Sequence, residues 1–189
     1  MDTAKIIENL KKRGFEAVFV QTKAEAVEKA LSYIPEGSSV AWGGSVSVEE
    51  SGLLARIKCG NFKLIDRDTA KTPEERIELM KKAFFADTFL TSFNAVSEDG
   101  VLYNIDGNGN RVAAISFGPA SVVALIGINK IVPSESELEQ RALKIAAPLN
   151  AKRLKLSNEQ DICAVFVKTR ICKNKGRIKI ILCQEELGY

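Results

Sequence analysis

The chain contains no histidine among its 189 residues. Histidine is the commonest general base, the commonest side-chain metal ligand and the central member of every Ser-His triad. Its absence excludes those triads from this chain. Any catalysis has to use carboxylates, lysine, arginine, serine, tyrosine, cysteine or backbone amides.

The chain also lacks a strong charge of either sign. It has 27 lysines and arginines against 24 aspartates and glutamates, a net charge of +3. A nucleic-acid-binding surface usually shows clustered basic residues. Here the basic groups at 11–13 and 81–82 lie in two separate predicted helices and fit solvated helix faces. We therefore expect no nucleic-acid partner.

Long apolar runs are missing too. The longest, "VVALIGINKIV" at 122–132, is interrupted by Gly127, Asn129 and Lys130 and is shorter than the ~18 residues of a membrane span, which favours a buried strand. The opening "MDTAKIIENLKKRGFE" is typical of an amphipathic helix and not of a signal peptide. Four cysteines without a secretory signal favour reduced thiols. We expect a cytoplasmic protein with no membrane span.

The cysteines do not form a metal-binding pattern. Cys163 and Cys172 are separated by eight residues with no cysteine between them, and Cys59 and Cys183 lie in apolar stretches. This spacing predicts neither a disulfide nor a metal site at Cys163 and Cys172. Buried, inert thiols are the expected state of the four residues.

The residues that are present alternate helical and strand patterns. Helices are expected at 3–14, 23–34, 47–60, 73–86 and 134–148, with Thr72 as a helix N-cap, and strands near 15–20, 38–42, 63–66 and 87–92. Strands separated by helices indicate a parallel sheet. The segments 100–105, 111–118 and 121–127 follow one another through short turns, which predicts an antiparallel or mixed insertion. We expect one α/β domain over residues 1–189, with a strand and tail at 176–189.

The segment "AWGGSVSVEESG" at 41–52 is a first candidate site. Gly43 and Gly44 let the backbone pass close to a ligand, and the following helix N-terminus is suited to an anion. Ser47 and Glu50 fit a capping box. A tight turn followed by an ordinary cap explains the same residues equally well.

The segment "DGNGNR" at 106–111 is a second candidate. A hairpin needs only a two-residue turn, yet Asp106, Asn108, Asn110 and Arg111 gather four polar groups between two segments expected to be apolar strands. The spacing resembles the start of a calcium loop, but the glycine and closing glutamate of an EF-hand are missing. A mobile hairpin tip is the plain alternative. The contrast between polar tip and apolar strands favours a binding loop.

Several stretches together resemble the LUD domain of lactate-utilisation proteins: "GGSVSVEESGLL", "SFNAVSEDGVLYNIDGNGNRVAAISFGP", "LIGINKIV", "AAPLNAKRL" and "GRIKIILCQEELGY". The resemblance covers essentially the whole chain. It implies a Rossmann-like, mostly parallel sheet with an antiparallel insertion, similar in fold to ribose-5-phosphate isomerase, glucosamine-6-phosphate deaminase and CoA transferases. The residues that match its motifs and are expected to bind ligand are Gly43, Gly44, Ser45, Asn94, Asn104, Asp106, Asn108, Asn110, Arg111 and Lys130.

The resemblance also implies a function. The better-known members act with iron–sulfur partner proteins in oxidising L-lactate to pyruvate, so this chain is expected to be a component of such a system. Many members carry a cysteine-rich run ending in Arg-Ile-Cys. Here Arg170, Ile171 and Cys172 remain without the intervening cysteines, so no metal or cluster is implied for this chain.

These residues lead to a hypothesis of one pocket at the carboxyl edge of the sheet. It would bind a small anionic, phosphate-bearing or CoA-like ligand through amides 44–46 and Arg111, with Glu98 as acid, base or nucleophile. A non-catalytic assembly protein for iron–sulfur partners and a ligand sensor are the alternatives. The sequence identifies no cofactor and leaves the substrate and a homo-oligomer open.

Overall fold

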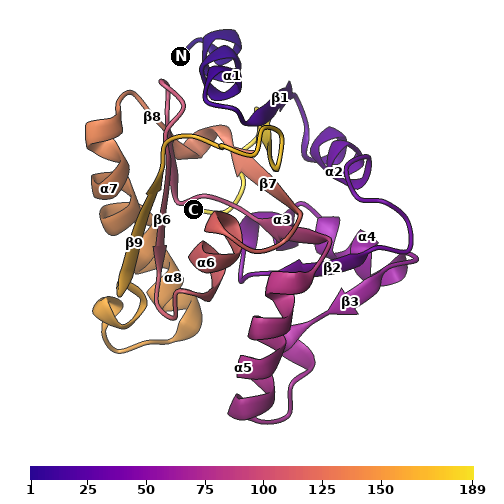
Figure 1. The fold of residues 1–189 in the computed structure, drawn as a ribbon. Helices are drawn as coiled ribbons and strands as arrows, with labels where there is room; N and C mark the ends of the chain where they lie inside the picture. Colours follow the sequence, from indigo (N-terminus) through magenta and orange to yellow (C-terminus); the bar gives the residue numbers. More distant parts are fainter.

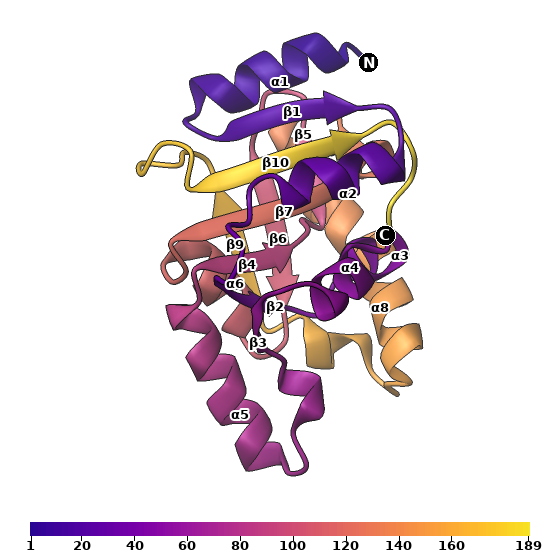
Figure 2. The ribbon, with the colours of Figure 1, turned by 90° about the vertical axis from the view of Figure 1, so that its right-hand side faces the viewer.

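Six parallel strands form the main sheet, in a computed structural model that describes residues 1–189 and all side chains except those of residues 159 and 160. The strand order is β1 (Glu16–Val20), β10 (Ile178–Cys183), β7 (Ser121–Gly127), β4 (Thr88–Thr91), β2 (Ser39–Trp42), β3 (Lys63–Ile65). All neighbouring pairs are parallel. Figure 2 shows β1 and β10 running side by side in the same direction. The four strands expected from the alternating pattern are confirmed.

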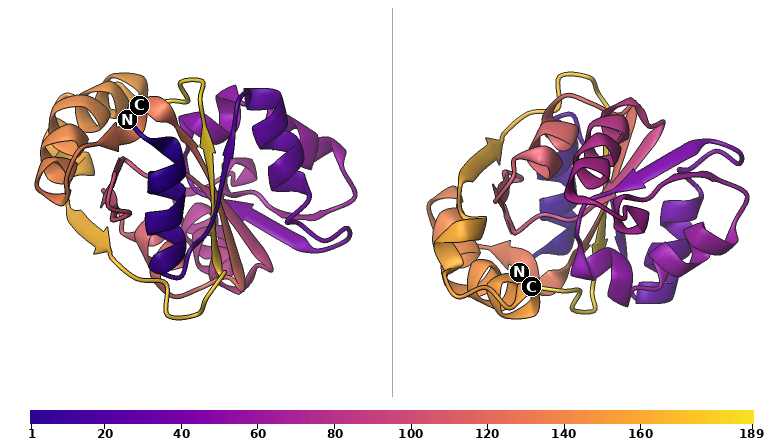
Figure 3. Two further views of the ribbon diagram at one scale, coloured as in Figure 1. Left: turned by 90° about the horizontal axis from the view of Figure 1, so that it is seen from above. Right: turned by 90° about the horizontal axis from the view of Figure 1, so that it is seen from below.

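Helices cover both faces of this sheet. On one face lie α2 (Lys23–Leu31), α3 (Val46–Glu50) and α4 (Leu53–Cys59), and on the other α1 (Thr3–Lys12) and α6 (Asn110–Ser116), with α5 (Pro73–Lys82) at the edge (Figures 1 and 3). Side chains cap several of these helices: Thr72 accepts from the Glu75 amide at 3.2 Å, with Pro73 as the first helical residue. The predicted cap at Thr72 is therefore confirmed.

A smaller sheet of four strands lies beyond α1 and α6. Its order is β8 (Ile131–Val132), β5 (Ala95–Ser97), β6 (Leu102–Asp106), β9 (Val165–Thr169). β6 runs antiparallel to β5 and β9, whereas β5 and β8 are parallel. Helices α7 (Leu138–Arg141) and α8 (Ala147–Leu154) flank it, joined by a π-helical segment at Ala142–Ala146 (Figure 3). The expected insertion with antiparallel strands is present.

Two expected strands differ in the structure. The segment 111–118 contains helix α6, because the Asp106 carboxylate accepts the amides of Arg111 at 2.9 Å and Val112 at 3.1 Å, and Gly109 turns the chain with φ of +76°. The segment 121–127 is β7 in the centre of the parallel sheet, outside the insertion. Its residues from Val122 to Gly127 are all buried, as expected for a strand covered on both faces.

The helix expected at 47–60 is also different. It is divided into α3 and α4 by Gly52, which has φ of +85°. Its cap is Ser45, whose hydroxyl accepts from the Val48 amide at 3.4 Å. The capping box proposed for Ser47 and Glu50 is therefore wrong, and the Ser47 hydroxyl is free for another role.

The cysteines are less uniformly buried than expected. Cys172 and Cys183 are buried and Cys163 is half-buried, but Cys59 is exposed because it is the last residue of α4 and lies on the side of that helix that faces away from the core.

Among the described helices, none combines the length and the apolarity that crossing a bilayer requires.

Candidate functional site

Three neighbouring strands of the main sheet deliver polar residues to the same edge. Ser45 follows β2, Ser92 and Asn94 follow β4, and Lys130 follows β7. The carboxyl ends of parallel strands share one edge of a sheet. At this edge, the residues that follow β2, β4 and β7 help to enclose a cavity of about 50 Å³, here named the inner cavity. Its polar lining comes from Ser45, Ser47, Ser92, Asn94, Arg111, Lys130, Asn150, Arg153 and Tyr189.

Lys130 is a buried ammonium or amine group in the wall of this cavity. Lys130 is only 2% exposed, and it is the last residue of the short 3₁₀ turn Ile128–Lys130 that follows β7. Its Nζ donates to the Ser47 hydroxyl at 2.7 Å and to the Ser92 hydroxyl at 3.0 Å. Because lysine is almost never fully buried without a partner, these two serines are central to the site.

The two hydroxyl groups have their own protons engaged elsewhere. Ser92 donates to the Leu125 carbonyl at 2.7 Å, and Ser47 donates to the Leu187 carbonyl at 3.1 Å. Both oxygens therefore act as acceptors for Lys130. A protonated lysine has three N–H groups, so one is left for a ligand in the cavity.

Burial lowers the pKa of Lys130 to about 7, with repulsion from Arg141 and Arg111 acting in the same direction. Glu50 opposes the shift. Desolvation penalises the charged form of a buried amine. Lys130 therefore exchanges between its charged and neutral forms near neutral pH.

Arg111 brings a second positive charge to the cavity. Its Nη1 donates to the Asn104 side chain at 2.6 Å and the Ser92 carbonyl at 3.2 Å. Its Nη2 donates to the Ile105 carbonyl at 2.5 Å and the Asn94 side chain at 3.1 Å. Burial lowers the pKa of this guanidinium. Since the terminal N–H groups are all used inside the protein, Arg111 supplies charge to a ligand and few donors.

Arg153 on α8 is the cation that keeps donors available. Its Nε donates to the Tyr189 hydroxyl at 3.0 Å, and its Nη2 donates to Asn150 at 3.0 Å. None of the hydrogen bonds among the described residues uses Nη1. Asn150 and Arg153 are three residues apart, so both face the cavity from one side of the helix. Arg153 can therefore contact an anion directly.

A wider groove of about 340 Å³, here named the outer groove, adjoins the inner cavity. The two share Gly44, Arg111 and Arg153 among their lining residues. The "DGNGN" loop contributes Asp106, Asn108 and Asn110, facing Arg67 and Arg76. In the structure this loop caps α6 through the Asp106 carboxylate and forms one wall of the outer groove.

The predicted site residues are distributed over three places. Gly44, Ser45, Asn94, Arg111 and Lys130 line the inner cavity. Asp106, Asn108 and Asn110 line the outer groove. Gly43 and Asn104 lie behind Arg111: Asn104 accepts its hydrogen bond, and a methyl group at Gly43 would come 3.0 Å from its Cδ.

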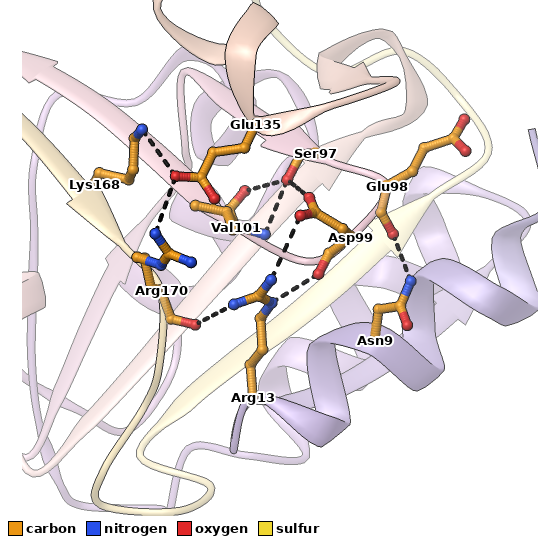
Figure 4. A network of polar contacts seen from close by, with 9 residues as sticks. All are labelled: Asn9, Arg13, Ser97, Glu98, Asp99, Val101, Glu135, Lys168 and Arg170. Atoms are coloured by element: carbon orange, nitrogen blue, oxygen red, sulfur yellow. Dashed lines mark hydrogen bonds and ion pairs between the residues drawn. The ribbon is translucent and has the colours of Figure 1, made fainter.

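Glu98 is not brought to the inner cavity. It lies in the turn after β5, where its carbonyl accepts from the Asn9 side chain at 2.9 Å, and Arg13 donates to the Asp99 carbonyl at 2.7 Å. Figure 4 shows this turn held against α1, with the Glu98 carboxylate directed away from the neighbouring polar groups. β5 carries the chain away from the edge that Asn94 occupies, and four residues are enough to separate the two.

Sequence reasoning missed Ser92, Asn150, Arg153 and Tyr189, all of which line the inner cavity. Asn150 and Arg153 stand within "AAPLNAKRL", and their i, i+3 spacing was the available signal. Ser92 is the last residue before the predicted polar turn at Asn94. Nothing in the sequence indicates that the Tyr189 hydroxyl accepts a hydrogen bond from Arg153.

The sequence model of the LUD domain matches residues 3–183. The chain belongs to the LUD domain family. Among solved structures, a DUF162 family protein from Deinococcus radiodurans is 14% identical with a TM-score of 0.58, over 97% of this chain and 99% of that one. The resemblance noted in the sequence motifs is thereby confirmed at the level of family and fold.

Two more distant structures are similar at a lower level. Ribose 5-phosphate isomerase A from Methanocaldococcus jannaschii is 18% identical over 61% of this chain and 56% of that one, with a TM-score of 0.40. The delta subunit of eIF2B from Chaetomium thermophilum is 15% identical over 93% and 59%, with a TM-score of 0.44. A comparison with curated proteins gave no match.

Two glycines of this LUD domain are expected to respond differently to substitution. A methyl group at Gly127 would overlap the backbone nitrogen of Leu187 and the side chain of Asn129, so Gly127→Ala should lower the free energy of unfolding by roughly 2–3 kcal/mol. Gly44→Ala would meet only the ends of Arg67 and Arg153, at 2.9 and 3.5 Å, and should leave stability within about 1 kcal/mol. Urea unfolding of both variants measures the difference. Equal losses would contradict the packing described here.

Proposed function

We propose that this LUD domain binds a small α-hydroxy or α-keto carboxylate, of the lactate and pyruvate type, in the inner cavity. One observation carries the proposal. Lys130, Arg111 and Arg153 line the cavity, and no aspartate or glutamate is found among its described lining side chains. Cations held in a confined, poorly solvated space attract an anion more strongly than they would in water.

The size of the cavity favours a small ligand. Its volume is about 50 Å³, whereas one water molecule needs about 10–15 Å³ on the same scale. There is room for an anion of a few non-hydrogen atoms. A carboxylate of lactate size suits this space better than a CoA ester.

The available donors suit a carboxylate as well. The third N–H of protonated Lys130 and the Nη1 group of Arg153 are the groups available to a ligand. Charge-assisted hydrogen bonds of this kind are shorter and stronger than neutral ones. In this proposal the chain is a lactate-utilisation component, and iron–sulfur partner proteins carry the electrons when L-lactate becomes pyruvate.

The test is isothermal titration calorimetry with L-lactate and pyruvate, with the neutral isostere lactamide as the ligand control. We expect Arg153→Gln to weaken carboxylate binding by about ten- to a hundredfold, since a hydrogen bond to a charged group contributes roughly 1.5–3 kcal/mol. Arg56→Gln is the matched protein control, because Arg56 pairs with Glu28 on the surface of α4. Lactamide binding as tightly as lactate would reject the proposal.

A phosphate-bearing ligand is the second candidate, and one observation favours it. The Nε of Arg67, in the wall of the outer groove, is buried without a hydrogen-bond partner among the described residues. A ligand reaching from the inner cavity into the outer groove could satisfy it. Titrations with inorganic phosphate and a sugar phosphate decide: Arg67→Gln should abolish phosphate binding and leave lactate binding unchanged, because Arg67 lines only the outer groove.

A further inference from the structure

Lys130 has a reactive geometry that anion binding alone does not require. We propose that its neutral amine forms an imine with the keto carbon of a small α-keto acid held in the inner cavity. This inference rests on the proposed function, because the keto acid has to enter that cavity first. It assigns Lys130 a covalent role beyond charge.

The hydrogen bonds of Lys130 direct its lone pair. The neutral amine has two N–H groups, and two oxygens accept them: the Ser47 hydroxyl at 2.7 Å and the Ser92 hydroxyl at 3.0 Å. Those hydroxyls donate their own protons to Leu187 and Leu125, so they cannot donate to the amine. The lone pair is then the only part of the nitrogen left unengaged. Since Lys130 lines the cavity, that is where it can meet a carbonyl carbon.

The surroundings keep a large fraction of the amine neutral. Lys130 is 2% exposed, Arg141 and Arg111 act on it as positive neighbours, and Glu50 is the one acidic group that opposes them. A lysine activated by desolvation and nearby cations is a recognised nucleophile for carbonyl groups. Lys58 is different: it is paired with Asp66 at 2.8 Å, and this hydrogen bond raises its pKa.

The step balances with the groups present. The Lys130 lone pair attacks the keto carbon, and the first of the two amine protons moves to the carbonyl oxygen to give a carbinolamine. Loss of that oxygen as water, with the second amine proton, leaves a carbon–nitrogen double bond. No oxidant or reductant is needed. The ligand carboxylate lies near Arg153, the cation with donors available, and the outer groove gives the water a path out.

Borohydride trapping tests the inference. The protein is incubated with pyruvate and sodium borohydride, digested, and mapped by mass spectrometry. We expect a carboxyethyl group on the Lys130 nitrogen at a level at least tenfold above that on exposed lysines such as Lys12, since a pKa of about 7 leaves about half of Lys130 neutral at pH 7. L-lactate has no keto group and should give no adduct, and excess lactate should suppress the reaction by competition.

Lys130→Met should abolish the adduct, with folding checked by circular dichroism. Ser92→Ala is the second variant: it removes one acceptor and should reduce trapping while leaving the lysine in place. Pyruvate that binds by calorimetry without modifying Lys130 would overturn the imine and leave the proposed function standing. Absence of both binding and trapping would overturn both. Equal modification of Lys12 and Lys130 would also reject the inference.

Discussion

Lys130→Met is expected to remove a rise in stability that the wild-type chain gains between about pH 7 and 10.5. The pKa of Lys130 is about 7 in the folded chain, mainly because of burial, against 10.5 for an ordinary lysine. Within this window the unfolded state holds more protons, so the free energy of unfolding rises with pH. At about 1.4 kcal/mol for each pKa unit, the rise attributable to Lys130 is on the order of 4–5 kcal/mol.

The measurement is urea unfolding at several pH values in wild type and variant. The difference between the two curves isolates Lys130 from the tyrosines, cysteines and other lysines that titrate in the same range. Lys12→Met is the matched control, since Lys12 is exposed and pairs with Glu8 on the surface. A pH dependence that is identical in wild type and Lys130→Met would contradict the buried position of this amine.

Arg111→Met is expected to lower the free energy of unfolding by about 3–5 kcal/mol. The side chain donates to four acceptors, the carbonyls of Ser92 and Ile105 and the amide oxygens of Asn94 and Asn104. Removing a buried charged partner leaves such acceptors unsatisfied. The place of Arg111 at the end of the polar loop "DGNGNR" predicts an exposed charge, and the loss of an exposed charge costs a fold little. The structure reverses that expectation, because Arg111 lies in the first turn of α6 and its guanidinium points inward.

Chemical unfolding of Arg111→Met beside Arg56→Met measures this effect. Arg56 has the same side chain in an exposed ion pair with Glu28, where the contribution is about 0–1 kcal/mol. Losses of similar size in the two variants would show that the internal hydrogen bonds of Arg111 contribute little. Because Arg111→Met lowers stability, a binding titration with an Arg111 variant first requires proof that the variant is folded.

The parallel sheet is readable from the sequence because each strand is a short apolar run between helices with clear end signals, such as Thr72 and Pro73. Helix α6 is not. "RVAAIS" is short and apolar enough to fit a strand, and only the long-range capping of Arg111 and Val112 by Asp106 makes it helical. β7 is misplaced for a related reason, since its neighbours β10 and β4 are distant in sequence.

The site follows the same division. The glycine turn, Asn94 and Lys130 can be placed together because each follows a strand of the parallel sheet. The burial of Lys130 and the contribution of α8 depend on tertiary packing, which local patterns do not encode. Glu98 is the opposite case. It is only four residues from Asn94 in the sequence, but β5 separates the two residues in the structure.

The guanidinium of Arg111 joins the two sheets of the molecule. Ser92 directly follows β4 of the main sheet, whereas Asn104 and Ile105 belong to β6 in the smaller one. The Arg111 side chain thus holds the two sheets together and also places a positive charge beside the cavity. A substitution of Arg111 that changed ligand preference would therefore also break the hydrogen bonds between the two sheets. Changes of ligand preference in this architecture are expected to arise on α8, where Asn150 and Arg153 contact the cavity from a separate element.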